Sequence, residues 1–149
     1  MGSYQKVVVG TDGSDTSFRA VDRAGALAGD SGAELIIVCA YEPASREEVD
    51  AATDALKEDA YQVVGSAPAE TTLRDAAARA RAVGARKIDT LAVEGSPVDV
   101  LGHAVSDRGA DLLVVGNVGL NTLSGRILGS VPQSVARRSG VDVLIVHTT

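Results

Sequence analysis

Residues 116–130 combine the residue types with which a polypeptide backbone can hold a phosphate group. The stretch follows the apolar run 112–115 and leads into a segment with helical character. Its glycines allow consecutive N–H groups to turn towards one point, and a helix N-terminus adds unpaired donors with a partial positive charge. An apolar strand, a glycine-rich loop and a helix start in this order predict a nucleotide-binding loop.

Asp12 is the second residue that could contribute chemistry, because it follows the apolar run 7–10 in the sequence Thr-Asp-Gly-Ser. A carboxylate at the end of a strand can accept hydrogen bonds from ribose hydroxyls, or hold a metal ion through water. It can equally be a turn residue whose side chain bonds its own backbone. Asp12 taken alone leaves these two interpretations open.

Short apolar runs alternate with segments of helical periodicity along the chain. These elements must position the glycine-rich stretch 116–130 and Asp12. Helices that separate short apolar strands favour a parallel sheet covered on both faces. We therefore expect one doubly wound α/β domain over residues 1–149, with a five-stranded parallel sheet and helices on both faces. The expected strands are 7–10, 35–40, 87–94, 111–116 and 142–147, and the expected helices are 15–28, 45–65, 69–83, 97–108 and 131–138.

The composition of the strands suggests their order in the sheet. The run 87–94 alternates charged and apolar residues, which suits an exposed edge, whereas the uniformly apolar first and fourth runs suit the centre. The order 3-2-1-4-5 satisfies both and places strands one and four side by side where the order reverses, the position at which such sheets bind ligands. One crevice then separates Gly10, Thr11 and Asp12 from Gly116, Asn117, Val118 and Gly119.

The overall composition argues against several classes of partner. A net charge of −6 disfavours nucleic acid and anionic membrane surfaces, and an aromatic content of 3% removes the stacking platforms of single-strand binders. No apolar run approaches the roughly 20 residues that span a bilayer, and no signal peptide is visible. Cys39 is the only cysteine, so no intrachain disulfide can form. We expect a cytoplasmic protein without a nucleic-acid or membrane partner.

The pattern Gly116-x2-Gly119-x9-Gly129-Ser130, after a strand that ends Val-Val-Gly, resembles the nucleotide-binding signature of universal stress protein domains. The N-terminal Val-Val-Val-Gly-Thr-Asp-Gly-Ser and the closing Asp-Val-Leu-Ile-Val-His resemble that family's first and last strands, so the likeness covers essentially the whole chain. The resemblance implies a dimeric sensor or reservoir of adenine nucleotides that acts in the stress response. It implies ATP or cyclic AMP as the ligand.

The same resemblance assigns ligand contacts to individual residues. Asp12 would lie near the ribose, and the backbone around Ala40, at the end of the second strand, near the adenine. The phosphate and ribose would be surrounded by Gly116, Gly119, Gly129, Ser130 and the amide of Val131. The crevice and the loop add Gly10, Thr11, Asn117, Val118 and Arg126 to the candidate contacts.

The loop contains no lysine, in contrast to phosphate loops of the Walker type, and Arg126 is its only cation. Backbone amides and a helix end must therefore carry most of the anion recognition. This suits one or two phosphates better than a full triphosphate, unless Mg²⁺ accompanies ATP. Cyclic AMP, which some members of the family bind, carries a single negative charge and is a serious candidate. Arg126 is as consistent with a solvated loop residue as with a ligand contact.

Two other functions compete with nucleotide binding. One is slow hydrolysis of ATP, but no residue stands out as a nucleophile, a base or a metal ligand, so we nominate no catalytic residue and no metal site. The other is an interaction module that needs no nucleotide. The last strand would be an uncapped apolar edge, so we expect a homodimer through the strand from Val143 to His147. Dimerisation and nucleotide binding are compatible.

Overall fold

The computed structural model describes residues 4–42, 67–117 and 140–147. Within these ranges the chain forms five strands and three helices, in the alternation that the sequence predicts. The strands are β1 (Lys6–Gly10), β2 (Glu34–Tyr41), β3 (Lys87–Glu94), β4 (Leu112–Gly116) and β5 (Asp142–Val146). The helices are α1 (Asp15–Ser31), α4 (Ala67–Ala82) and α5 (Pro97–Arg108). The expected helices at 45–65 and 131–138 lie outside the described residues.

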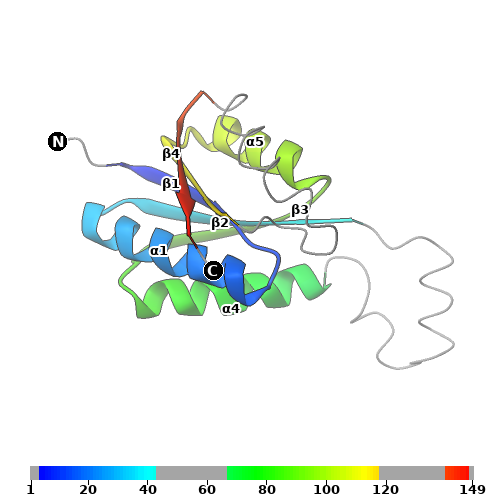
Figure 1. The fold of residues 1–149 in the computed structure, drawn as a ribbon, viewed down its shortest axis with the longest axis horizontal. Helices are drawn as coiled ribbons and strands as arrows, with labels where there is room; N and C mark the ends of the chain where they lie inside the picture. Colours follow the sequence, from blue (N-terminus) through cyan, green and yellow to red (C-terminus); the bar gives the residue numbers. More distant parts are fainter. Residues whose placement is uncertain (1–3, 43–66, 118–139, 148–149) are drawn as a thin grey trace, which may run out of the picture.

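The strands form one parallel sheet in the order β3-β2-β1-β4-β5 (Figure 1), which confirms the expected topology. β1 and β4 lie side by side in the centre, where Val9 is opposite Val114. β3, with its alternating charged and apolar residues, forms one edge and, in the described part of the chain, pairs with β2 alone. The strand order therefore reverses between β1 and β4, as predicted.

Helices cover both faces of this sheet. α1 and α4 pack together on one face, and α5 covers the other (Figure 1). Successive residues of a strand point to opposite faces, so Val7 and Val9 pack with α1 and α4, whereas Val8 packs with α5. All three valines are fully buried. Burial on both faces explains why the central strands are continuous apolar runs in the sequence.

Close contact between α1 and α4 fixes the position of α4 above the sheet. A Cβ on Gly25 of α1 would lie 2.9 Å from Cγ2 of Val83, so the two helices approach closely at a residue without a side chain. Arg79 of α4 donates two hydrogen bonds to the carboxylate of Asp22, and its guanidinium lies 5.2 Å from the centre of the Phe18 ring. Within the described ranges, no helix is long and apolar enough to cross a membrane.

Candidate functional site

The carboxyl ends of β1 and β4 meet at one edge of the sheet. Val9 of β1 pairs with Val114 of β4. β1 ends at Gly10, one residue after Val9, and β4 ends at Gly116, two residues after Val114. Both glycines are buried. The two predicted ligand loops therefore leave the sheet next to each other, at its topological switch point, where parallel α/β sheets bind ligands.

Thr11, the first residue of the β1 loop, is held inside the fold by its own polar atoms. Its hydroxyl lies 2.7 Å from that of Ser17, and the two side chains are 1% and 3% exposed. Its backbone N–H donates to the carbonyl of Val38 at 2.9 Å. These bonds involve both the hydroxyl and the backbone N–H of Thr11 within the protein, so this residue shapes the loop. Its direct contact with a ligand stays a prediction.

In the described part of the chain, Asp12 uses one of its two carboxylate oxygens for the turn. Oδ1 accepts hydrogen bonds from the backbone N–H of Ser14 at 2.9 Å and from its hydroxyl at 2.6 Å. The Ser14 hydroxyl in turn accepts from the N–H of Ser17 and caps α1. Oδ2 accepts no hydrogen bond from any described residue. The turn interpretation is therefore observed, and the second oxygen leaves the ribose interpretation open.

Gly13 brings helix α4 against the β1 loop. Its φ is +85°, in the region that side chains disfavour, and a Cβ built on it would lie 2.8 Å from Oγ1 of Thr72. Thr72 belongs to the second turn of α4, about sixty residues further along the chain. Glycine thus meets both a conformational and a steric requirement here, and the contact makes α4 a wall of the site.

A cavity of about 180 Å³ opens between these elements. Asp12 lies in its wall together with Ala40, the two residues that the family resemblance implies near the ribose and the base. The remaining lining residues come from the end of β2 and the start of α4. They are Cys39, Tyr41, Pro68, Ala69 and Thr72. The structure thus brings Asp12 and Ala40 into one cavity, although neither the strand pattern nor the glycine pattern identified the α4 residues beside them.

Cys39 is a buried thiol beside this cavity, with 5% of its surface exposed. Burial, and to a smaller extent the negative charge of Asp12, together raise the pKa of the thiol from 9.0 to about 11. The thiol therefore stays protonated at neutral pH. A protonated thiol is a poor nucleophile, so Cys39 acts as a small apolar wall residue.

The end of β4 is fastened to the end of β5. The backbone N–H of Asn117 donates to the carbonyl of Val146 at 2.8 Å, and its side-chain nitrogen lies 3.4 Å from Nδ1 of His147. Gly116 and Asn117 are thus positioned at the start of the predicted phosphate loop. The other candidate contacts of that loop lie outside the described residues and stay predictions: Val118, Gly119, Arg126, Gly129, Ser130 and Val131.

The described part of this site contains hydrogen-bonding groups and an apolar wall. In the ranges 4–42, 67–117 and 140–147, no three side chains of His, Cys, Asp or Glu gather in a way that could hold a metal ion. Three residues with polar side chains, Asp12, Tyr41 and Thr72, line the cavity together with the apolar Ala40, Pro68 and Ala69. This arrangement can recognise a polar ligand by hydrogen bonds and shape.

Known proteins resemble this chain over its whole length. The universal stress protein family matches residues 3–147. Universal stress protein Rv1636 of Mycobacterium tuberculosis is 54% identical over 149 residues, which cover 100% of both chains, and its crystal structure superposes with a TM-score of 0.63 over 100% and 99% of the two chains. A crystal structure of a universal stress protein in complex with cAMP is 52% identical, with a TM-score of 0.77, and covers 99% and 100% of the two chains.

Proposed function

The chain belongs to the universal stress protein family, and on that basis we propose that it binds an adenine nucleotide at the ends of β1 and β4. The observation that carries the proposal is the cavity in which the Asp12 carboxylate and the Ala40 strand end lie together. The predicted phosphate loop leaves β4 at the same edge of the sheet. Ribose, base and phosphate would then each have a counterpart within reach of one crevice.

Of the two candidate ligands, we favour cyclic AMP over ATP. A relative that is 52% identical over 99% of this chain was crystallised with cAMP. Cyclic AMP has a single negative charge, which suits a loop of backbone amides without a lysine. It also keeps only one ribose hydroxyl, and Asp12 has one oxygen that accepts no hydrogen bond from a described residue. ATP would need Mg²⁺ to offset its larger charge.

The residues of the crevice would share the ligand as follows. Oδ2 of Asp12 would accept a hydrogen bond from the ribose hydroxyl, and the backbone near Ala40 would contact the adenine. The phosphate would be held by backbone N–H groups in the stretch from Gly116 to Val131, with Gly119, Gly129 and Ser130 closest to it. Thr72 and Tyr41, which line the cavity, would close the site from the sides of α4 and β2.

Calorimetric titration with cyclic AMP, ATP, ADP and AMP, each with and without Mg²⁺, tests this proposal directly. We expect cyclic AMP to bind most tightly and independently of Mg²⁺, and ATP to bind only when Mg²⁺ is present. GTP serves as the control for recognition of the base. Absence of heat and of thermal stabilisation with all four adenine nucleotides would refute the proposal.

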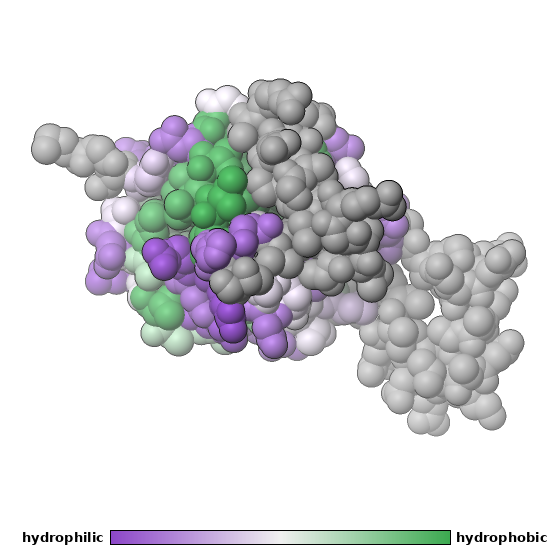
Figure 2. Space-filling view, viewed as in Figure 1, coloured by the Kyte–Doolittle hydropathy of each residue, from purple (hydrophilic) through white to green (hydrophobic). Residues whose placement is uncertain are grey.

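We propose further that the protein acts as a homodimer through β5 and as a single domain over residues 1–149. Hydrophobic side chains gather around β5 in the view of Figure 2, and Ile145 is 51% exposed. β5 pairs with β4 alone in the described part of the chain, which leaves its outer edge for a second copy. A dimeric nucleotide sensor or reservoir of the cytoplasm, where adenine nucleotides are made and used, is the role that we propose.

A further inference from the structure

The second turn of α4 carries a hydroxyl group next to the loop that follows β1. Of the side-chain atoms of Thr72, Oγ1 lies closest to the position of a Cβ on Gly13, at 2.8 Å, whereas the methyl carbon Cγ2 lies at 3.4 Å. The hydroxyl, rather than the methyl group, is therefore turned towards this loop. Thr72 also lines the cavity of about 180 Å³ whose wall contains Asp12, the residue that precedes Gly13.

The hydroxyl of Thr72 is not used to hold the described part of the fold together. A threonine inside a helix can donate to the carbonyl group one turn earlier, but Thr72 forms no hydrogen bond with a described residue. The hydroxyls of Thr11 and Ser17, by contrast, lie 2.7 Å apart and satisfy each other. Thr72 is half-buried. A ligand in the cavity can therefore bond this hydroxyl without breaking a bond between described residues.

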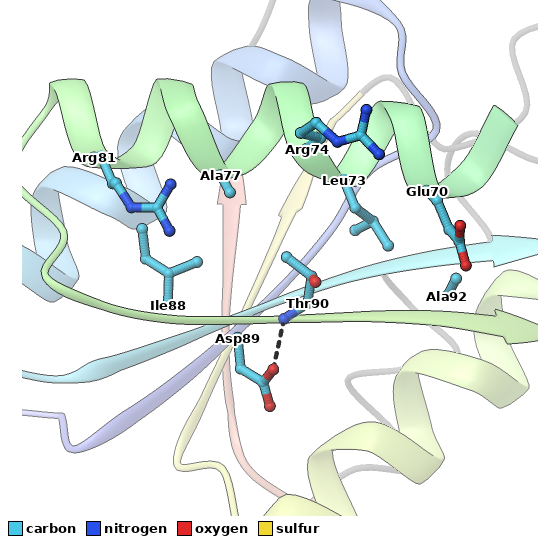
Figure 3. A pocket seen from close by; sticks show the side chains of 9 residues that line it. All are labelled: Glu70, Leu73, Arg74, Ala77, Arg81, Ile88, Asp89, Thr90 and Ala92. Atoms are coloured by element: carbon cyan, nitrogen blue, oxygen red, sulfur yellow. Dashed lines mark hydrogen bonds between the residues drawn. The ribbon is translucent and has the colours of Figure 1, made fainter. Parts of the chain in front are cut away.

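The packing of α4 on the sheet holds Thr72 in place. The next residue, Leu73, is buried together with Ala77, and Figure 3 shows both pointing from α4 towards β3. A second and larger cavity, of about 480 Å³, lies between this part of α4 and β3, where Thr90 belongs to its lining. On its other side α4 packs against α1. The hydroxyl of Thr72 is thus positioned before any ligand arrives, which lowers the cost of binding one.

Asp12 and Thr72 offer complementary hydrogen-bonding groups to a single ligand hydroxyl. A hydroxyl group is both a donor and an acceptor, an ionised carboxylate can only accept, and the threonine hydroxyl can donate. Oδ1 of Asp12 is used by Ser14, and Oδ2 accepts no hydrogen bond from a described residue. Tyr41, which also lines the cavity, follows Ala40 in β2, on the side proposed for the base.

We propose that Thr72 donates a hydrogen bond to the 2′-hydroxyl of the ribose while Asp12 accepts one from it, so that the site selects ribonucleotides over deoxyribonucleotides. This inference rests on the proposed nucleotide function. The 2′-hydroxyl is the group by which a protein tells ribose from deoxyribose. A deoxyribose leaves both protein groups without their partner, and a site built to bond a hydroxyl rejects the analogue that lacks it.

Calorimetric titration with cyclic AMP and with 2′-deoxy cyclic AMP tests this selectivity, and the ratio of the two affinities is the decisive quantity. For ATP, the corresponding analogue is dATP. A hydrogen bond to a charged group contributes a factor of roughly ten or more in affinity, and one between neutral groups a factor of roughly three. We therefore expect the parent protein to prefer cyclic AMP by about thirtyfold.

Two substitutions of Thr72 separate its hydroxyl from its shape. Thr72→Val removes the hydroxyl and keeps the branched side chain, so it should lower the ratio about threefold by weakening the binding of cyclic AMP alone. Thr72→Ser keeps the hydroxyl and should retain the ratio. A merely structural role for Thr72 would weaken the binding of both ligands equally and leave the ratio unchanged.

Two further variants are the controls. Thr90→Val makes the same chemical change in the lining of the cavity between α4 and β3. Tyr41→Phe removes the other hydroxyl-bearing side chain from the lining of the nucleotide cavity. Both variants should keep the ratio of the parent protein, because neither changes a group that we place at the 2′-hydroxyl.

A ratio close to one in the parent protein, a measurement that needs no variant, would overturn the inference. So would a ratio that Thr72→Val leaves unchanged, or one that Tyr41→Phe lowers as much as Thr72→Val does. In each of these cases the nucleotide still binds, and the proposed function stands. If the parent protein binds no adenine nucleotide at all, the proposed function fails, and the inference fails with it.

Discussion

Gly13 and Thr72 lie so close together that a Cβ on Gly13 would be 2.8 Å from the Thr72 hydroxyl oxygen. This contact joins the loop after β1 to the second turn of α4. It gives the candidate nucleotide site a wall that no local sequence pattern predicts.

We expect Gly13→Ala to destabilise the protein by about 1–3 kcal/mol, because alanine is strained at a φ of +85° and its Cβ meets Thr72. Chemical denaturation measures the loss. In a double-mutant cycle, Thr72→Ala should recover the steric part and leave the conformational part. Gly102→Ala, where a Cβ meets nothing within 4 Å, is the control and should be neutral or slightly stabilising. Equal stability of Gly13→Ala and the parent would contradict the described loop.

Asp12→Asn separates the two roles of this carboxylate. The asparagine oxygen can still accept from the N–H of Ser14, so the cap of α1 and the stability should survive. The side-chain NH₂ replaces the second oxygen and cannot accept a hydrogen bond from a ribose hydroxyl. The affinity for cyclic AMP should therefore fall about tenfold. Calorimetry measures this, with Asp15→Asn, an exposed position in the first turn of α1, as the control. Unchanged affinity would remove Asp12 from the site.

The thiol of Cys39 should titrate near pH 11 in the folded protein, against 9.0 for an ordinary cysteine, because burial raises its pKa. Since the folded pKa is raised, this thiol contributes stability below pH 9 that is lost as the pH rises from 9 towards 11. The ¹³Cβ shift of the single, selectively labelled cysteine follows the titration.

The variant Asp12→Asn provides the comparison for that titration. It removes the neighbouring negative charge, which is the smaller cause, so the pKa of Cys39 should fall but stay above 9.0. A midpoint at the ordinary value in the folded parent protein would show that the thiol is not buried as described.

Ile145→Lys should convert the proposed dimer to a monomer, because it places a charge on the exposed apolar side of β5. Light scattering should then report the 15.2 kDa of one chain in place of twice that mass. Val93→Lys is the matched control, since Val93 is 36% exposed on β3, at the other edge of the sheet. If both variants, or neither, change the mass, the interface lies elsewhere.

Much of the fold could be predicted from sequence because it depends on local patterns. Continuous apolar runs indicated strands buried on both faces, and the charged alternation from Lys87 to Glu94 indicated an edge. Together they gave the strand order, and the order placed the loop of Gly10 beside that of Gly116. The pattern of apolar and charged runs was therefore enough to predict where the candidate site lies.

The composition of the site could be predicted only in part. Asp12 follows the end of β1 and Ala40 lies next to the end of β2, at the same edge of the sheet, so strand position was enough to bring them together. Pro68 and Thr72 reach the cavity through the docking of α4 on α1, which depends on close contacts such as that of Gly25 with Val83. Contacts of this kind join residues far apart in the chain, and helical periodicity does not specify them.

α4 has one further consequence, because a single helix serves both cavities. Its start lines the pocket that contains Asp12, and its later turns carry Arg74 and Arg81 above β3. A ligand that shifts this helix in either cavity changes the walls of the other. Two ligands that bound these cavities would therefore be thermodynamically linked, and whatever factor one applied to the affinity of the second, the second would have to apply to the first. Titrating each ligand in the presence of the other would give the same coupling free energy from both directions.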